Sequence, residues 1–197
     1  MILEKYLLNE PGDPIEQGFG SRSNQVFDGL YETGRQYFEV GITACKEKKL
    51  IMVNLWHLGI EIILKSGIVR KYKLVSVQDT HKILKAVKDV YNHDLQKLWS
   101  DFKELYYNED NNLSVFDKVI TDLEPWTDIK YPKVQEESII INRESVEIIF
   151  SQKTNFQINK PVEDYVIDAK RVEDFHNKLR SLLGGYSIYD TIKKHSN

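Results

Sequence analysis

The chain has 197 residues, of which 41% are hydrophobic and 29% are charged, and its formal net charge is −3. This length and composition allow a sizeable buried core and exclude a globally disordered protein. The near balance of charges gives no global sign of a nucleic-acid-binding protein, and the single cysteine, Cys45, excludes an intrachain disulfide.

Residues 1–24 are predicted to form an irregular lead-in, because proline and glycine are frequent between Pro11 and Gly20. The first long helix then runs to about residue 48, with Ser23 or Asn24 as its cap. Its apolar stripe recurs at steps of three or four and consists of Phe27, Tyr31, Gly34, Phe38, Gly41 and Cys45. The two glycines of this stripe indicate either a close helix–helix approach or tolerated surface positions.

The second helix is predicted over Ile51–Ser66, with Gly67 as its C-cap. It is apolar almost all round, which is typical of a helix in the middle of a bundle. Its polar residues form one narrow stripe, made of Asn54, His57, Glu61 and Lys65. We therefore expect Glu61 to be buried and bonded to a cation, either Lys65 or Lys130. The Ile51–Leu64 stretch is too short and too polar to span a bilayer, and the first residues lack a secretory signal, so we expect a cytoplasmic protein.

A basic connection follows over Ile68–Asn92, with a helix predicted within Thr80–Val90. Helices are also predicted over His93–Tyr107, after a capping sequence at Ser114, and over Val162–Leu183. A β-hairpin is predicted near residues 138–158, with a third strand over Asn155–Ile158, because β-branched apolar residues gather there.

Together these elements predict a mainly α fold, an antiparallel up-and-down bundle of four to five helices with a small β-hairpin insertion near residues 138–158. The bundle spans residues 25–183, and residues 184–197 form a C-terminal tail.

Three segments, in order, resemble the HEPN family, the higher eukaryotes and prokaryotes nucleotide-binding domain. His57–Lys65 contains a Glu followed by a Leu-Lys pair, as on the family's buried second helix. His93–Leu95 resembles the His-Asp-Leu motif at the start of the third helix, and Asp128–Pro132 resembles the Arg-Tyr-Pro segment, with Lys in place of Arg. The residues that carry the resemblance are His57, Glu61, Lys65, His93, Asp94, Lys130, Tyr131 and Pro132. The predicted hairpin and the long basic connection depart from the compact family pattern.

The resemblance implies a homodimer that binds RNA or a nucleotide, often within a toxin–antitoxin or antiviral defence system. It also implies a nucleotidyltransferase or an antitoxin as a candidate partner. Active members carry Arg-x4-6-His and cut RNA without a metal ion. Here Arg171 and His176 fit Arg-x4-His on the final helix. The histidine would transfer a proton and the arginine would stabilise the phosphorane, but chance composition and surface salt bridging explain the same spacing. Val172 stands where active members have a polar residue, and Glu173 and Asp174 would repel phosphate.

Charge is unevenly distributed along the chain. Residues 65–88 contain seven Lys or Arg and one carboxylate, whereas residues 101–124 contain seven Asp or Glu and two Lys. The candidate RNA- or nucleotide-binding residues are Lys65, Arg70, Lys71, Tyr72 and Lys73, because aromatic rings stack on bases while cations meet phosphates. An exposed basic loop is the alternative. His57 and Glu61 have metal-ligand spacing, but the sequence shows no third ligand, so no metal and no cofactor are predicted.

Three hypotheses follow for function. The first is a HEPN-like RNA- or nucleotide-binding or partner module without its own cleavage activity. The second is a metal-independent endoribonuclease that uses Arg171 and His176. The third is an unrelated helical scaffold. Catalysis requires both side chains in one shared cleft, which separates the second hypothesis from the other two.

Overall fold

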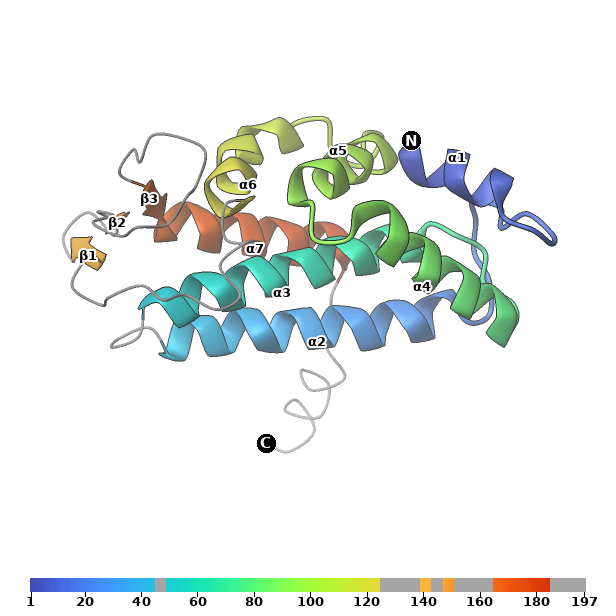
Figure 1. The fold of residues 1–197 in the computed structure, drawn as a ribbon, viewed down its shortest axis with the longest axis horizontal. Helices are drawn as coiled ribbons and strands as arrows, with labels where there is room; N and C mark the ends of the chain where they lie inside the picture. Colours follow the sequence, from blue (N-terminus) through green and yellow to red (C-terminus); the bar gives the residue numbers. More distant parts are fainter. Residues whose placement is uncertain (45–48, 125–138, 143–146, 151–164, 185–197) are drawn as a thin grey trace.

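The computed structural model describes residues 1–44, 49–124, 139–142, 147–150 and 165–184. Within them the helices are α1 (Ile2–Asn9), α2 (Ser23–Ala44), α3 (Lys49–Arg70), α4 (Val77–Tyr91), α5 (Leu95–Leu105), α6 (Asp117–Leu123) and α7 (Ala169–Leu183), and a 3-10 turn, η1 (Leu113–Phe116), precedes α6. Figure 1 shows α3 at the centre, with α2 on its lower side and α7 on its upper side; α5 and α6 lie above α7, and α4 lies to the right, towards α1. The predicted mainly α bundle is confirmed, but the described residues contain seven α-helices instead of the predicted four to five.

The long contact between α2 and α3 depends on glycines. A Cβ placed on Gly34 would lie 2.8 Å from the carbonyl oxygen of Gly59, and a Cβ on Gly59 would lie 2.8 Å from that of Gly34. A Cβ on Gly41 would lie 2.8 Å from Cδ1 of Trp56. The close helix–helix approach predicted at Gly34 and Gly41 is therefore confirmed, and Gly59 supplies its other side.

The helix α3 is longer than the sequence predicts. Gly67 is not its C-cap but lies inside it, where its carbonyl oxygen accepts a hydrogen bond of 2.9 Å from the hydroxyl of Tyr106. A Cβ on Gly67 would lie 2.5 Å from Cε2 of Phe102, so tertiary packing explains this glycine. With the four additional residues at its C-terminal end, about one turn, Ile51–Arg70 is long and apolar enough to cross a membrane by length and composition, although most of it is buried inside the bundle.

The irregular lead-in predicted for residues 1–24 is wrong at its start, because Ile2–Asn9 is helical. The buried carboxylate of Asp101 caps this helix by accepting hydrogen bonds from the backbone N–H groups of Ile2 (2.9 Å) and Leu3 (3.2 Å). The same carboxylate accepts a third hydrogen bond, of 2.7 Å, from the hydroxyl of Tyr91. A distant side chain thus stabilises α1, and no local pattern reveals it.

The region predicted as a basic connection is mostly helical. It contains the last residues of α3 and all of α4, which begins with a capping box between Ser76 and Asp79. The next helix, α5, is capped by Asp94, whose side chain accepts a hydrogen bond of 2.8 Å from the backbone N–H of Lys97. Asn92, adopting a φ of 47°, ends α4.

Three short strands, β1 (Ile139–Asn142), β2 (Glu147–Phe150) and β3 (Tyr165–Asp168), pair antiparallel in that order. Most of the hairpin predicted near residues 138–158, including the strand Asn155–Ile158, lies outside the described residues. The final helix was predicted from Val162, but Tyr165–Asp168 is extended and α7 begins at Ala169. Asp168 caps α7, since its side chain accepts a hydrogen bond of 3.0 Å from the backbone N–H of Arg171.

Candidate functional site

A buried polar cluster forms where α3 meets the start of α5. Glu61 is 3% exposed, and it accepts a hydrogen bond from Nζ of Lys65 one turn later. Nδ1 of His93 lies 3.1 Å and 3.2 Å from the two carboxylate oxygens of Glu61, and Nδ1 of His57 lies 4.0 Å from one of them. The prediction of a buried Glu61 bonded to Lys65 is confirmed.

This cluster joins two of the three segments that carry the HEPN resemblance. Nζ of Lys65 also donates a hydrogen bond of 2.7 Å to the carbonyl oxygen of Asn92, which fixes the turn between α4 and α5 against α3. Asp94 follows directly as the cap of α5. Lys130, Tyr131 and Pro132, the third segment, lie outside the described residues.

The cluster around Glu61 is better suited to stabilising the fold than to catalysis. Glu61 and His57 are buried, so a substrate has no access to them in the folded chain. Within the described part of the chain, no group of three or more His, Cys, Asp or Glu side chains is placed to hold a metal ion. A buried, bonded carboxylate of this kind fixes the relative positions of helices.

The two candidate catalytic residues point to different neighbours. Nη2 of Arg171 donates a hydrogen bond of 2.8 Å to the carbonyl oxygen of Val115, within η1. The ring of His176 is 6% exposed and stacks on Phe38 of α2, with the ring centroids 4.0 Å apart and the planes 8° apart. The structure therefore does not bring Arg171 and His176 into one cleft.

Burial also changes the chemistry of His176. The pKa of its imidazole falls from 6.5 to about 4, because burial disfavours the charged form and Arg180 and Arg35 add positive charge nearby. Among the described residues, Nε2 of this ring has no hydrogen-bond partner. A neutral, enclosed ring packed on a phenylalanine acts as a core side chain in this conformation.

The five residues predicted to bind RNA do not share one surface. Tyr72 is only 1% exposed, so the expectation that it stacks on a base is wrong. Lys65 belongs to the buried cluster around Glu61. Lys73 is exposed, and its backbone N–H donates to the carbonyl oxygen of Glu16 at 2.8 Å. Only Arg70 and Lys71 remain together at a hollow of the surface.

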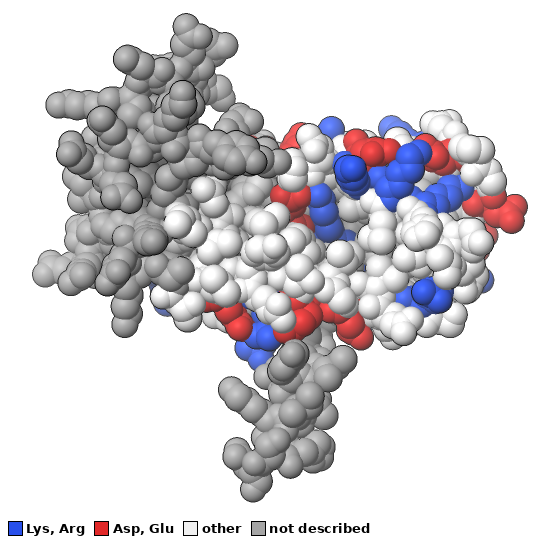
Figure 2. Space-filling model, turned by 60° about the horizontal axis from the view of Figure 1, so that its bottom comes forward, with Lys and Arg blue, Asp and Glu red and all other residues white. Residues whose placement is uncertain are grey.

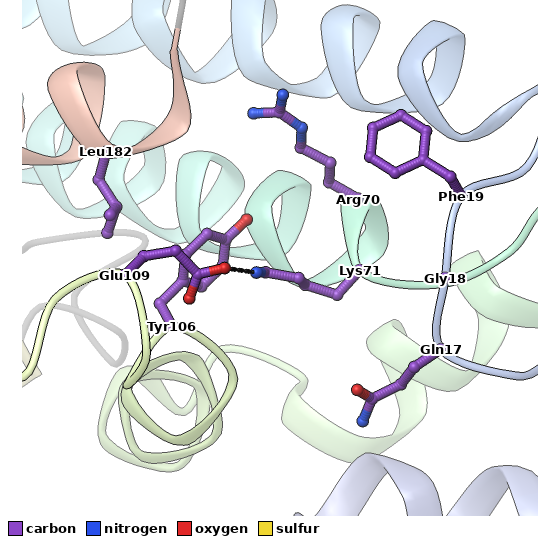
Figure 3. A pocket seen from close by; sticks show the side chains of 8 residues that line it. All are labelled: Gln17, Gly18, Phe19, Arg70, Lys71, Tyr106, Glu109 and Leu182. Atoms are coloured by element: carbon purple, nitrogen blue, oxygen red, sulfur yellow. Dashed lines mark hydrogen bonds and ion pairs between the residues drawn. The ribbon is translucent and has the colours of Figure 1, made fainter.

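That hollow is a pocket of about 550 Å³ at the C-terminal end of α3. It is lined by Gln17, Gly18, Phe19, Arg70, Lys71, Tyr106, Glu109 and Leu182 (Figure 3). Nζ of Lys71 lies 4.1 Å from the centroid of the Tyr106 ring and is paired with Glu109. The guanidinium of Arg70 lies 4.6 Å from the centroid of the Phe27 ring and donates to the carbonyl oxygen of Leu183.

Sequence reasoning identified Arg70 and Lys71 but missed the rest of the pocket. Its walls come from the first loop, α3, the end of α5 and α7, which are far apart along the chain. Phe19, placed between two glycines, was the only local signal, because an aromatic residue in a turn-rich segment has no periodic reason to be there.

No protein-family model, curated protein or solved structure matches this chain. The HEPN resemblance therefore rests on the three sequence segments alone.

Proposed function

We propose that this chain is a HEPN-like module that binds RNA or a nucleotide in the cytoplasm and does not cleave RNA itself. The observation that carries the proposal is the pocket beside Arg70 and Lys71. The two cations lie over the buried rings of Phe27 and Tyr106, and the exposed ring of Phe19 lines the same pocket. Cations that meet phosphates and rings that stack on bases are the elements of nucleic-acid and nucleotide binding.

The buried position of His176 supports the absence of cleavage. A general acid or base must reach the proton that it transfers, and this ring is enclosed between α7 and α2. The cluster of Glu61, Lys65 and His93 supports the HEPN-like arrangement, because it joins two segments that resemble family motifs.

A homodimer is part of the proposal. Of the two long helices α2 and α7, α2 offers the better surface for it. Half-buried or exposed residues recur along α2 at steps of four and three, at Val26, Leu30, Thr33, Tyr37 and Val40. Figure 2, which views the molecule from the side of α2, shows a broad area with few charged atoms and charges at its margins. A charge-poor stripe with this spacing fits a second helix of the same kind. The exposed residues of α7 include Lys170, Glu173 and Asp174, which suit solvent better.

By the same resemblance, a nucleotidyltransferase or an antitoxin is the proposed partner, and a toxin–antitoxin or antiviral system is the proposed setting. Co-purification of the tagged chain with such a protein from its native cells would test this part.

The experiment for the main proposal combines binding and cleavage. Purified protein is titrated against a fluorescent single-stranded oligoribonucleotide and against nucleotides, and it is incubated separately with mixed cellular RNA and EDTA. We expect binding that weakens as salt rises, and no cleavage. Cleavage that disappears in His176→Ala would favour the endoribonuclease instead, and the absence of any binding would favour the helical scaffold.

A further inference from the structure

Phe19 is held in solvent by an anchored loop. Its side chain is 69% exposed, yet the backbone around it is fixed against the residues that follow α3. The N–H of Gly18 donates to the carbonyl oxygen of Lys71 at 2.9 Å, and that of Arg22 donates to the carbonyl oxygen of Leu74 at 2.9 Å. A Cβ on Gly20 would lie 2.2 Å from the same oxygen of Leu74. A large ring presented on a fixed backbone is suited to stack on a planar ligand.

The pocket contains a carboxylate, that of Glu109, beside the ammonium group of Lys71. Glu109 is exposed and is paired with Nζ of Lys71, and this pairing lowers the pKa of its carboxyl group. In Figure 3 the pair crosses the middle of the view, Arg70 and Phe19 lie above it, and Lys71 extends from the same end of α3 as Arg70. The carboxylate therefore occupies the position that an anionic group of a ligand would take at Lys71.

The size and charge of the pocket favour a small-molecule ligand over a single strand of RNA. Its volume of about 550 Å³ falls within the range of roughly 300–1,000 Å³ that is usual for small-molecule sites. Three helices, α3, α5 and α7, end beside it at Arg70, Leu105 and Leu183. Because helix C-termini carry partial negative charge, they disfavour a chain of phosphates and tolerate a single anionic group that pairs directly with a cation.

We propose that this pocket binds one nucleotide through a terminal phosphate, and that Glu109 acts as an internal competitor that leaves Lys71 when the phosphate arrives. The base lies against Phe19 and the guanidinium of Arg70, since both aromatic rings and guanidinium planes stack on bases. This inference rests on the proposed function and assigns its site, its ligand class and its regulation.

The test is calorimetric titration of the full chain with AMP, adenosine and inorganic phosphate. AMP binds more tightly than either of its parts, because different residues of the pocket recognise the base and the phosphate. Phe19→Ala weakens AMP binding about fivefold or more through lost stacking. Lys71→Met also weakens it, whereas Glu109→Gln strengthens it about threefold or more by removing the competing charge. Lys73→Ala is the matched control, because this neighbouring lysine does not line the pocket, and it leaves the affinity unchanged.

Each alternative result has a defined meaning. AMP binding that Glu109→Gln leaves unchanged or weakens would refute the internal competitor. Inorganic phosphate binding as tightly as AMP would refute the base contact at Phe19. If an oligoribonucleotide binds, but AMP does not and the pocket variants have no effect, the pocket assignment fails and the proposed function stands. If neither binds, both fail. Circular dichroism and thermal melting of each variant confirm that these surface substitutions leave the fold intact.

Discussion

Replacing Glu61 by Ala is expected to destabilise the chain well beyond the loss of an ordinary ion pair. The carboxylate is 3% exposed and accepts bonds from Lys65 and His93. In the variant, the half-buried ammonium of Lys65 keeps its hydrogen bond to the carbonyl oxygen of Asn92 but loses its ion pair with Glu61. His93 loses its contact with the same carboxylate. Groups left unsatisfied in a largely buried place cost about 1–3 kcal/mol, so we expect a loss of that size in the free energy of unfolding.

Glu39→Ala is the matched control. Glu39 also lies on a long helix and pairs with a cation four residues away, Arg35, but its side chain is 47% exposed. A surface pair of this kind contributes about 0–1 kcal/mol. Urea denaturation measures both variants, and a shifted midpoint with an unchanged m-value assigns the difference to stability. Equal losses in the two variants, or no loss in Glu61→Ala, would refute the idea that burial of the cluster decides its contribution.

Four further predictions follow from the structure. Gly59→Ala places a methyl group 2.8 Å from backbone oxygen and should lower the unfolding midpoint by overpacking, whereas Gly29→Ala, with open space around it, should raise it slightly. Asp101→Asn should weaken the attachment of α1, seen as faster amide hydrogen exchange in residues 2–9. Because the pKa of His176 is about 4 when folded and 6.5 otherwise, the unfolded chain takes up a proton first as pH falls. Stability should therefore decrease from about pH 6.5 to pH 4, and less steeply in His176→Phe, when denaturation is followed at each pH. Val40→Glu should convert a dimer to a monomer in sedimentation, and a monomeric parent chain would contradict the proposed interface.

The sequence predicted what depends on local periodicity. The stripe of Phe27, Tyr31 and Phe38 was assigned to the core and is buried, because apolar residues at helical spacing face a common neighbour. Glu61 was assigned a buried cation partner from its place on an almost wholly apolar helix, and Lys65 fills that role. In both cases the sequence of one helix is enough to predict whether a side chain on it is buried.

The sequence failed where a distant residue decides the outcome. Gly67 resembles a helix end, but Phe102 packs against it and α3 continues to Arg70. Tyr72 lies among basic residues and resembles a surface ring, yet it is buried, and its carbonyl oxygen accepts a hydrogen bond of 2.8 Å from the hydroxyl of Ser23. The walls of the pocket likewise come from four separate parts of the chain, so no spacing rule could assemble them.

The helix α3 connects the two features on which the proposals depend, and their separation along it has a consequence for mutagenesis. Glu61 and Lys65 lie in its buried middle, whereas Arg70 lies at its last turn beside the pocket. A substitution at Glu61 would therefore lower ligand binding only by reducing the folded fraction, and excess ligand would restore stability through mass action. A substitution at Lys71 would lower the affinity at constant stability. Measuring the free energy of unfolding and the ligand affinity for substitutions at Glu61 and at Lys71 therefore separates a residue that stabilises the fold from one that is proposed to contact the ligand.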